Sequence, residues 1–129
     1  VRHSNWGWFT GTLSSDTLDS RCNISVGGVR TRHEQYQILA FNRGFEASWQ
    51  PHDPQALSKT MVVASHSGLE KTFVCRVEVE RGRYVVGRLE RDICTIPYTA
   101  QQESPVPVMV KFDVLRWKGG SSGFFPPQV

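Results

Sequence analysis

A repeated pattern is the feature that most limits how this 129-residue chain can fold. Glycine, cysteine and aromatic motifs of its first part return in the same order later on. The matching pairs are Gly11 with Gly87, Cys22 with Cys94, and Tyr36 with Phe112, and the loops between them differ in length. Repetition on this scale predicts two similar units that together build one fold. It also argues against a single enzymatic site, because duplicated units more often present similar binding surfaces.

The hydrophobic pattern has a period of two. Residues 73–80 end in a clear alternation, Arg81-Gly82 predicts a turn, and residues 84–89 follow as a second strand, which indicates a β-hairpin. Further strands are predicted from β-branched and aromatic content at residues 6–13, 22–26, 35–41, 60–64, 93–98 and 108–117. We therefore predict an all-β fold of roughly eight to ten antiparallel strands, in which two intertwined pseudo-symmetric repeats form a compact barrel, prism or sandwich.

A single all-β domain is predicted over residues 1–117, with a partial repeat at about 6–41 and a full repeat at 46–117. The proline-containing stretches 50–55 and 101–107 predict connectors, because proline cannot pair within a central strand. Residues 118–129 begin with a glycine- and serine-rich stretch, a composition typical of a flexible tail.

Charge and hydropathy exclude two classes of partner. The net charge is only +3, and in the arginine-rich interval 76–91 acidic residues alternate with the basic ones. Nucleic-acid binding needs a patch of one sign, so we expect no nucleic-acid partner. No apolar run is long enough to cross a bilayer, so we expect no membrane insertion.

The three cysteines leave two alternatives open. Cys22 and Cys94 hold matching places, so they face each other across a pseudo-twofold axis or are two equivalent buried thiols, and the pattern favours buried thiols. Cys75 lies in an apolar strand and is also predicted to be buried. Asn23-Ile24-Ser25 is a glycosylation sequon and makes Asn23 a glycosylation site, which favours a secreted or extracellular protein.

Residues that could support catalysis are poorly arranged. His33 and Glu34 are adjacent on a predicted strand and would point to opposite faces. The Ser65-His66-Ser67 triplet has no identifiable acid or oxyanion partner. We expect no enzyme, no metal site and no cofactor.

The order of the motifs resembles the DM9 repeat. That family's pattern runs roughly Y-V-x-R-A, G, G-K, C-Y-I-P-Y-G-G and Y-E-V-L. The later copy has it as Phe73-Val74-Cys75-Arg76, Gly82, Gly87-Arg88, Cys94-Thr95-Ile96-Pro97-Tyr98 and Phe112-Asp113-Val114-Leu115. The earlier copy resembles the second half of the pattern, so that Val1 aligns with Val77 and the chain begins where a first repeat would be half over.

The resemblance implies interlocked repeats and carbohydrate recognition of the mannose type, as in DM9 lectins of innate immunity. In those lectins a lysine follows the glycine of G-K, whereas this chain has Arg88 in the later copy and Thr12 in the earlier one. A modified sugar site is therefore predicted around Arg88, Tyr84 and the loop at His66. The alternative for Arg88 is a strand charge paired with Glu78 or Glu90.

Trp8 adds an aromatic group to the predicted ligand-binding residues. It lies two residues after Trp6, so both rings would share one face and could stack on a sugar ring, the alternative being a core position. Two functions remain open at this stage. One is a lectin-like domain that binds glycans. The other is a protein-interaction or assembly module, homo-oligomeric or with a protein partner, whose repeats have lost sugar binding.

Overall fold

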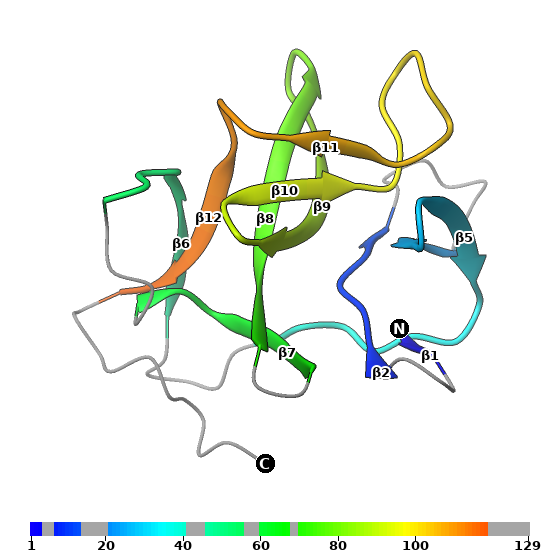
Figure 1. The fold of residues 1–129 in the computed structure, drawn as a ribbon, viewed down its shortest axis with the longest axis horizontal. Coiled ribbons are helices and arrows are strands. Elements are labelled where there is room, and N and C mark those ends of the chain that lie inside the picture. Colours follow the sequence, from blue (N-terminus) through cyan, green and yellow to red (C-terminus); the bar gives the residue numbers. More distant parts are fainter. Residues whose placement is uncertain (4–6, 14–20, 41–45, 56–59, 68–69, 119–129) are drawn as a thin grey trace.

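The computed structural model describes residues 1–3, 7–13, 21–40, 46–55, 60–67 and 70–118, and their regular structure is almost entirely β (Figure 1). The strands within these ranges are β1 (Arg2–His3), β2 (Gly7–Trp8), β3 (Thr12–Leu13), β4 (Cys22–Val26), β5 (Val29–His33), β6 (Ala47–Pro51), β7 (Val63–Ser67), β8 (Glu70–Glu80), β9 (Arg83–Glu90), β10 (Ile93–Ile96), β11 (Val106–Val108) and β12 (Asp113–Trp117). The predicted all-β class is confirmed.

The strands form three antiparallel sheets. The largest runs in the order β11-β10-β9-β8-β12-β6, and β7 pairs with β8 beside this path. A second sheet has the order β3-β4-β5, and β1 pairs with β2. In Figure 1 the two smaller sheets lie together on one side of the long β8–β9 hairpin. The sheets do not close into a barrel, and the arrangement is sandwich-like.

The two sequence repeats fold with the same strand register. In the first copy Thr12 lies opposite Asn23 and Leu13 opposite Cys22. In the second copy the corresponding pairs are Arg88 with Thr95 and Leu89 with Cys94. The equivalence extends to the next strand, because Cys22 faces His33 in β5 as Cys94 faces Val108 in β11. Thus β3-β4-β5 corresponds to the end of β9 with β10 and β11.

The equivalence also reaches back to the first residue. Arg2 pairs with Trp8 as Glu78 pairs with Tyr84, which makes β1 and β2 the counterparts of the end of β8 and the start of β9. Val1 exchanges both backbone hydrogen bonds with Phe9, at 2.8 and 2.6 Å. Val1 therefore holds the place that Val77 holds in the second copy.

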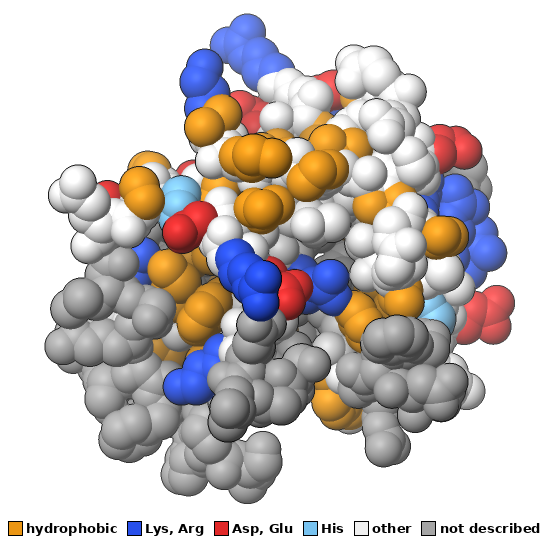
Figure 2. Space-filling model, viewed as in Figure 1, with side chains coloured by type: hydrophobic (Ala, Val, Ile, Leu, Met, Phe, Trp, Pro, Cys, Tyr) orange, Lys and Arg blue, Asp and Glu red, His pale blue; other side chains and the backbone are white. Residues whose placement is uncertain are grey.

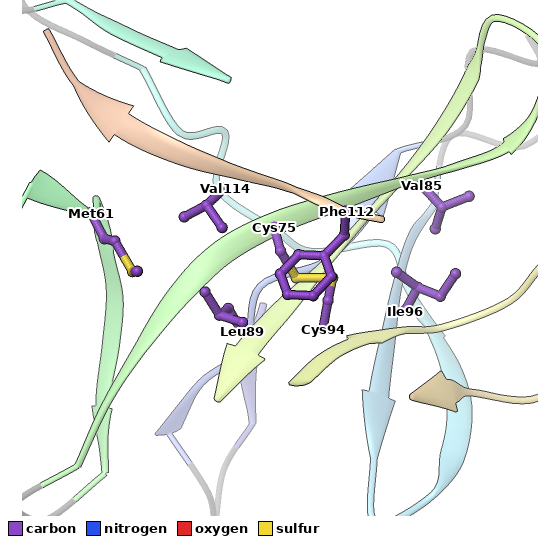
Figure 3. Packing of buried hydrophobic residues seen from close by; sticks show 8 residues of the cluster. All are labelled: Met61, Cys75, Val85, Leu89, Cys94, Ile96, Phe112 and Val114. Carbon is purple, nitrogen blue, oxygen red and sulfur yellow. A yellow bond between two sulfur atoms is a disulfide. The ribbon is translucent and has the colours of Figure 1, made fainter. Parts of the chain in front are cut away.

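Each repeat builds a core from corresponding residues. The second-repeat core contains the buried side chains Met61, Cys75, Val85, Leu89, Cys94, Ile96, Phe112 and Val114 (Figure 3). The first-repeat core contains Val1, Cys22 and Ile24, with Phe9, Val26 and Tyr36 packed against them. On the other face of the large sheet a third cluster forms around Val62, Val74, Leu115 and Trp117. Trp49 packs on that cluster.

A disulfide joins Cys75 in β8 to Cys94 in β10 at the centre of the second-repeat core. The prediction of two equivalent buried thiols is therefore wrong for Cys94, and Cys75 is not free either. Cys22 does remain a buried thiol. The cause is strand order, because β9 is the neighbour of both β8 and β10 and brings the two cysteines within reach of each other.

Several strand predictions needed correction. Residues 35–40 form no strand, although their counterparts lead into β12. The predicted strand 108–117 is divided between β11 and β12 by a turn at residues 109–112, in which Lys111 has a φ of 59°. The predicted connectors are shorter than expected, because β6 extends to Pro51 and β11 begins at Val106. Of the predicted tail at residues 118–129, Lys118 is described, and the rest lies outside the described residues.

Both strands at the ends of the large-sheet path carry a proline, Pro51 in β6 and Pro107 in β11. A proline nitrogen cannot donate to a neighbouring strand, so proline is tolerated in a sheet at its outer strands. This is why two sequence stretches that predict connectors still contain paired residues.

Candidate functional site

A surface pocket of about 140 Å³ lies where the two repeats meet. Leu13 comes from β3 of the first copy, and all the other lining residues come from the second copy. Those others are Val79, Gly82, Arg83, Tyr84, Val85 and Tyr98. Leu13 is 41% exposed, whereas its counterpart Leu89 is 2% exposed in the core, so the first copy presents an apolar group here that the second copy buries.

The β8–β9 turn places opposite charges beside this pocket. Glu80 and Arg83 flank the turn, and their side chains form an ion pair of 3.5 Å between Oε2 and Nη1. The side chain of Glu78 accepts a hydrogen bond from the backbone N–H of Gly82, whose φ of 77° suits glycine. The turn is thus held in one shape, and the Arg83 side chain, which is 62% exposed, stays available to a ligand.

Tyr98 lines the pocket, and a contact from the first repeat holds its ring in place. The Arg30 guanidinium carbon lies 4.3 Å from the centre of the Tyr98 ring. Arg30 is itself fixed by a hydrogen bond of 2.7 Å from its Nε to the Asn23 side-chain oxygen. This contact joins β5 of one copy to the segment just after β10 in the other.

Tyr84 touches the pocket but directs its ring elsewhere. The guanidinium of Arg76 lies 4.0 Å from the Tyr84 ring and 4.7 Å from the Trp49 ring. Asp113 anchors that guanidinium through a 3.0 Å ion pair to its Nε. Because successive side chains of a strand alternate between faces, the Tyr84 ring and the pocket-lining Val85 side chain lie on opposite faces of the sheet.

Arg88 is engaged within the protein. Its Nε lies 3.4 Å from Glu90 Oε2, close enough for an ion pair although not aligned as a hydrogen bond. Its guanidinium lies 5.0 Å from the centre of the Phe9 ring in the first repeat. This agrees with the alternative of a strand charge paired with Glu90. Arg88 and Arg30 thus make reciprocal contacts with aromatic rings across the junction between the repeats.

Trp8 and His66 lie on the neighbouring strands β2 and β7, which contact each other. Trp8 is 43% exposed and does not line the pocket. The side chain of His66 lies outside the described residues. Tyr84 is four residues from Arg88 along β9, about 13 Å at the usual rise of a strand. Tyr84 and Arg88, two of the predicted ligand residues, therefore lie apart along β9.

The sequon asparagine is enclosed. Asn23 is 1% exposed, its oxygen accepts from Arg30, and its nitrogen donates to the Arg21 carbonyl at 3.4 Å. A glycan on this nitrogen would have to displace the groups that enclose the side chain. The sequence identifies the sequon, but it does not predict that Asn23 is buried.

Sequence reasoning missed Arg83, Glu80 and Tyr98 as members of the site. A signal for the first two was present, because a two-residue turn at Arg81-Gly82 places Glu80 opposite Arg83. Tyr98 could not have been found in this way, since its place in the pocket depends on how the two repeats meet.

No protein-family model, curated protein or solved structure matches this chain. The DM9 resemblance therefore stays a hypothesis based on motif order. No helix long and apolar enough to span a bilayer occurs in the part of the chain that the structure describes.

Proposed function

We propose that this domain recognises carbohydrate at the pocket between its two repeats. The observation that carries the proposal is the combination of the Tyr98 ring with the Arg83–Glu80 ion pair beside a pocket of about 140 Å³. A pocket of this volume is smaller than sites for drug-sized ligands, and it suits one ring at the end of a larger molecule.

The chemistry of these groups matches that of a sugar. A guanidinium donates hydrogen bonds to neighbouring hydroxyls, and a carboxylate accepts them. Aromatic and apolar groups such as Tyr98 and Leu13 contact the C–H face of a sugar ring. The counterparts of Arg83 and Tyr98 in the first copy are Gly7 and Val26, so the same set of groups is not repeated there.

The resemblance to DM9 lectins supports a mannose-type ligand and a role in innate immunity. The Cys75–Cys94 disulfide is typical of proteins from oxidising compartments, which agrees with a secreted or extracellular location.

A glycan array tests the proposal, with purified chain compared with the variants Arg83→Ala, Arg88→Ala and Tyr84→Ala. We expect Arg83→Ala to weaken binding of the preferred glycan about tenfold. Tyr84→Ala removes a ring from the opposite face and is expected to change binding less than twofold. Arg32→Ala, an exposed arginine on β5, is the matched control for loss of one positive charge.

Two results would contradict this site. Loss of binding in Arg88→Ala with normal binding in Arg83→Ala would move the sugar site to the position predicted from the repeat pattern. Absence of any glycan signal from a folded chain would reject carbohydrate recognition altogether.

A second candidate function, protein binding, is favoured by an exposed apolar surface. Hydrophobic side chains gather over β10 and β11 in the upper part of Figure 2. Met109 and Val110, in the turn after β11, are 64% and 70% exposed. Sedimentation of the chain and of Val110→Asp tests this candidate, which requires a defined oligomer or complex that the aspartate dissociates.

A further inference from the structure

The aromatic ring of the pocket in the second repeat is contacted by a side chain of the first repeat. Tyr98 is half-buried, and its side chain both lines the pocket and packs against the second-repeat core. The Arg30 guanidinium carbon lies 4.3 Å from the centre of the ring, within the range in which a cation is attracted by an aromatic face. Arg30 does not line the pocket. It can therefore act on a ligand through the orientation of Tyr98.

The main chain on both sides of Tyr98 is already held. Pro97 is fully buried. The Thr99 hydroxyl accepts hydrogen bonds from the backbone N–H groups of Gln101 and Gln102, at 3.2 and 3.1 Å. The freedom that is left to Tyr98 therefore lies in its side-chain torsions, which decide which part of the ring a ligand meets.

Arg30 is held as firmly as the ring that it contacts. Arg30 lies opposite Ser25, and Asn23 lies opposite Arg32, so the side chains of Asn23 and Arg30 are diagonal neighbours on one face of the sheet. The Arg30 Nε donates a 2.7 Å hydrogen bond to the side-chain oxygen of Asn23, which is 1% exposed. This bond fixes the guanidinium at its Nε and leaves the planar group beyond it to lie over the Tyr98 ring.

The contact is made in one direction only. By strand register, the counterpart of Tyr98 in the first copy is Val26, and the counterpart of Arg30 in the second copy is Pro105. Neither counterpart supplies a ring or a cation. The second repeat therefore cannot support an equivalent group of the first in this way. This asymmetry agrees with a binding pocket in the second copy whose support lies in the first.

We propose that Arg30 is a positioning residue of the sugar site, an inference that rests on the proposed function for its ligand. Arg30 holds the Tyr98 ring in the orientation that contacts the C–H face of a sugar, and it makes no contact with the sugar itself. A ring that is fixed before the ligand arrives loses less conformational freedom on binding. By thermodynamic linkage, a sugar that needs the ring in this place also strengthens the contact between Arg30 and Tyr98.

The variant Arg30→Gln separates positioning from folding. The side-chain nitrogen of glutamine stands at the same place along the side chain as the Nε of arginine, so this variant keeps a donor for Asn23 and loses the guanidinium over Tyr98. Arg30→Lys is the rescue variant, because it returns a positive charge to the ring. Arg32→Ala is the matched control, since Arg32 is an exposed arginine on the same strand and the same face.

NMR spectra of the chain without ligand test the positioning directly. In the unsubstituted chain we expect the Arg30 Nε–H resonance to be shifted upfield by the Tyr98 ring, and this shift should be absent in Tyr98→Leu. In Arg30→Gln we expect the Tyr98 ring to change its nuclear Overhauser contacts with Leu13 and Val85, which line the pocket with it. Arg32→Ala should leave these contacts unchanged.

Titration with methyl α-mannoside tests the effect on binding. We expect Arg30→Gln to raise the Kd at least about threefold, and Arg30→Lys to bring it back to within about twofold of the unsubstituted chain. Because Arg30 acts through the ring, Arg30→Gln should change the Kd by less than about twofold when Tyr98 is already leucine. Saturation with the mannoside should slow hydrogen exchange at the Arg30 Nε–H.

Two results would overturn the positioning role. One is a Tyr98 ring whose resonances and contacts are the same in Arg30→Gln, whether or not the mannoside binds. The other is an equal rise in Kd with and without the Tyr98 ring, because Arg30 would then contact the sugar itself. If the folded, unsubstituted chain binds no mannoside, the proposed mannose-type function fails instead, and the spectra of the free chain alone decide whether Arg30 positions Tyr98.

Discussion

Gly11 and Gly87 occupy the same close contact in the two repeats. A Cβ atom on Gly11 would lie 2.5 Å from the Asn23 carbonyl oxygen, and one on Gly87 would lie 2.2 Å from the Thr95 carbonyl oxygen. Asn23 and Thr95 are themselves counterparts, so the repeat conserves a site where two backbones approach without a side chain between them. This explains why both copies have glycine at this position.

Substitution of either glycine by alanine should destabilise the protein. The methyl group meets backbone, which moves less easily than a side-chain end, so we expect Gly87→Ala to lower the free energy of unfolding by about 1–3 kcal/mol, and Gly11→Ala to act in the same direction. Gly82→Asn is the control, because that position is open and its positive φ is one that asparagine tolerates. Urea unfolding measures the stability of all three variants. An unchanged free energy of unfolding in Gly87→Ala would contradict the close contact.

Removal of the disulfide should have a large effect. Cys75 and Cys94 are 19 residues apart, and a closed loop of that length contributes about 3 kcal/mol in the chain-entropy account. We expect the double variant Cys75→Ser/Cys94→Ser to unfold at a correspondingly lower urea concentration. Dithiothreitol should destabilise the natural sequence to a similar degree and leave the double variant unchanged. An unaltered midpoint in the reduced natural sequence would argue against this pairing.

The buried Cys22 thiol predicts a specific pH dependence. Burial raises its folded-state pKa above the ordinary value of 9.0, so the folded chain retains a proton that the unfolded chain releases. Its contribution to stability is complete below pH 9 and decreases as the pH rises through the folded pKa. Cys22→Ala should lose stability through its cavity at every pH but lack this alkaline decrease. Unfolding curves of both proteins at pH 7 to 10 should therefore converge, and parallel curves would contradict the shift.

The two arginines that contact rings across the repeat junction should differ in importance. Arg30→Ala removes the contact with Tyr98 and also leaves the oxygen of the buried Asn23 without its 2.7 Å partner, so we expect a loss of about 2 kcal/mol. Arg88→Ala removes an ion pair and a longer ring contact, so about 1 kcal/mol is expected. Equal losses in thermal unfolding would mean that the Asn23 bond contributes little.

The sequence was sufficient for the architecture where the signals were local or repeated. Alternation in residues 73–89 predicted the β8–β9 hairpin, and the Gly–Leu–Cys–Ile order predicted two equivalent units. The pairing of Cys75 with Cys94 was not predictable in this way, because it depends on β8 and β10 lying on either side of β9. The same limit applies to the pocket, where Leu13 and Tyr98 meet only through the packing of one repeat on the other.

At residues 35–40 the sequence predicted a strand that the structure does not contain. Their composition resembles a strand because their counterparts lead into one, but a strand also needs neighbours, and β6 and β8 supply these only in the second repeat. A pattern of side chains therefore predicts where a strand can form and not whether its partners are in place.

The prolines of β6 and β11 have a consequence for how many molecules can associate. An outer strand with a proline lacks one backbone N–H donor and is a poor template for a further strand. We therefore expect no further strand to pair with β6 or β11. At high concentration the protein should consequently not elongate into fibres through β6 or β11 of the large sheet.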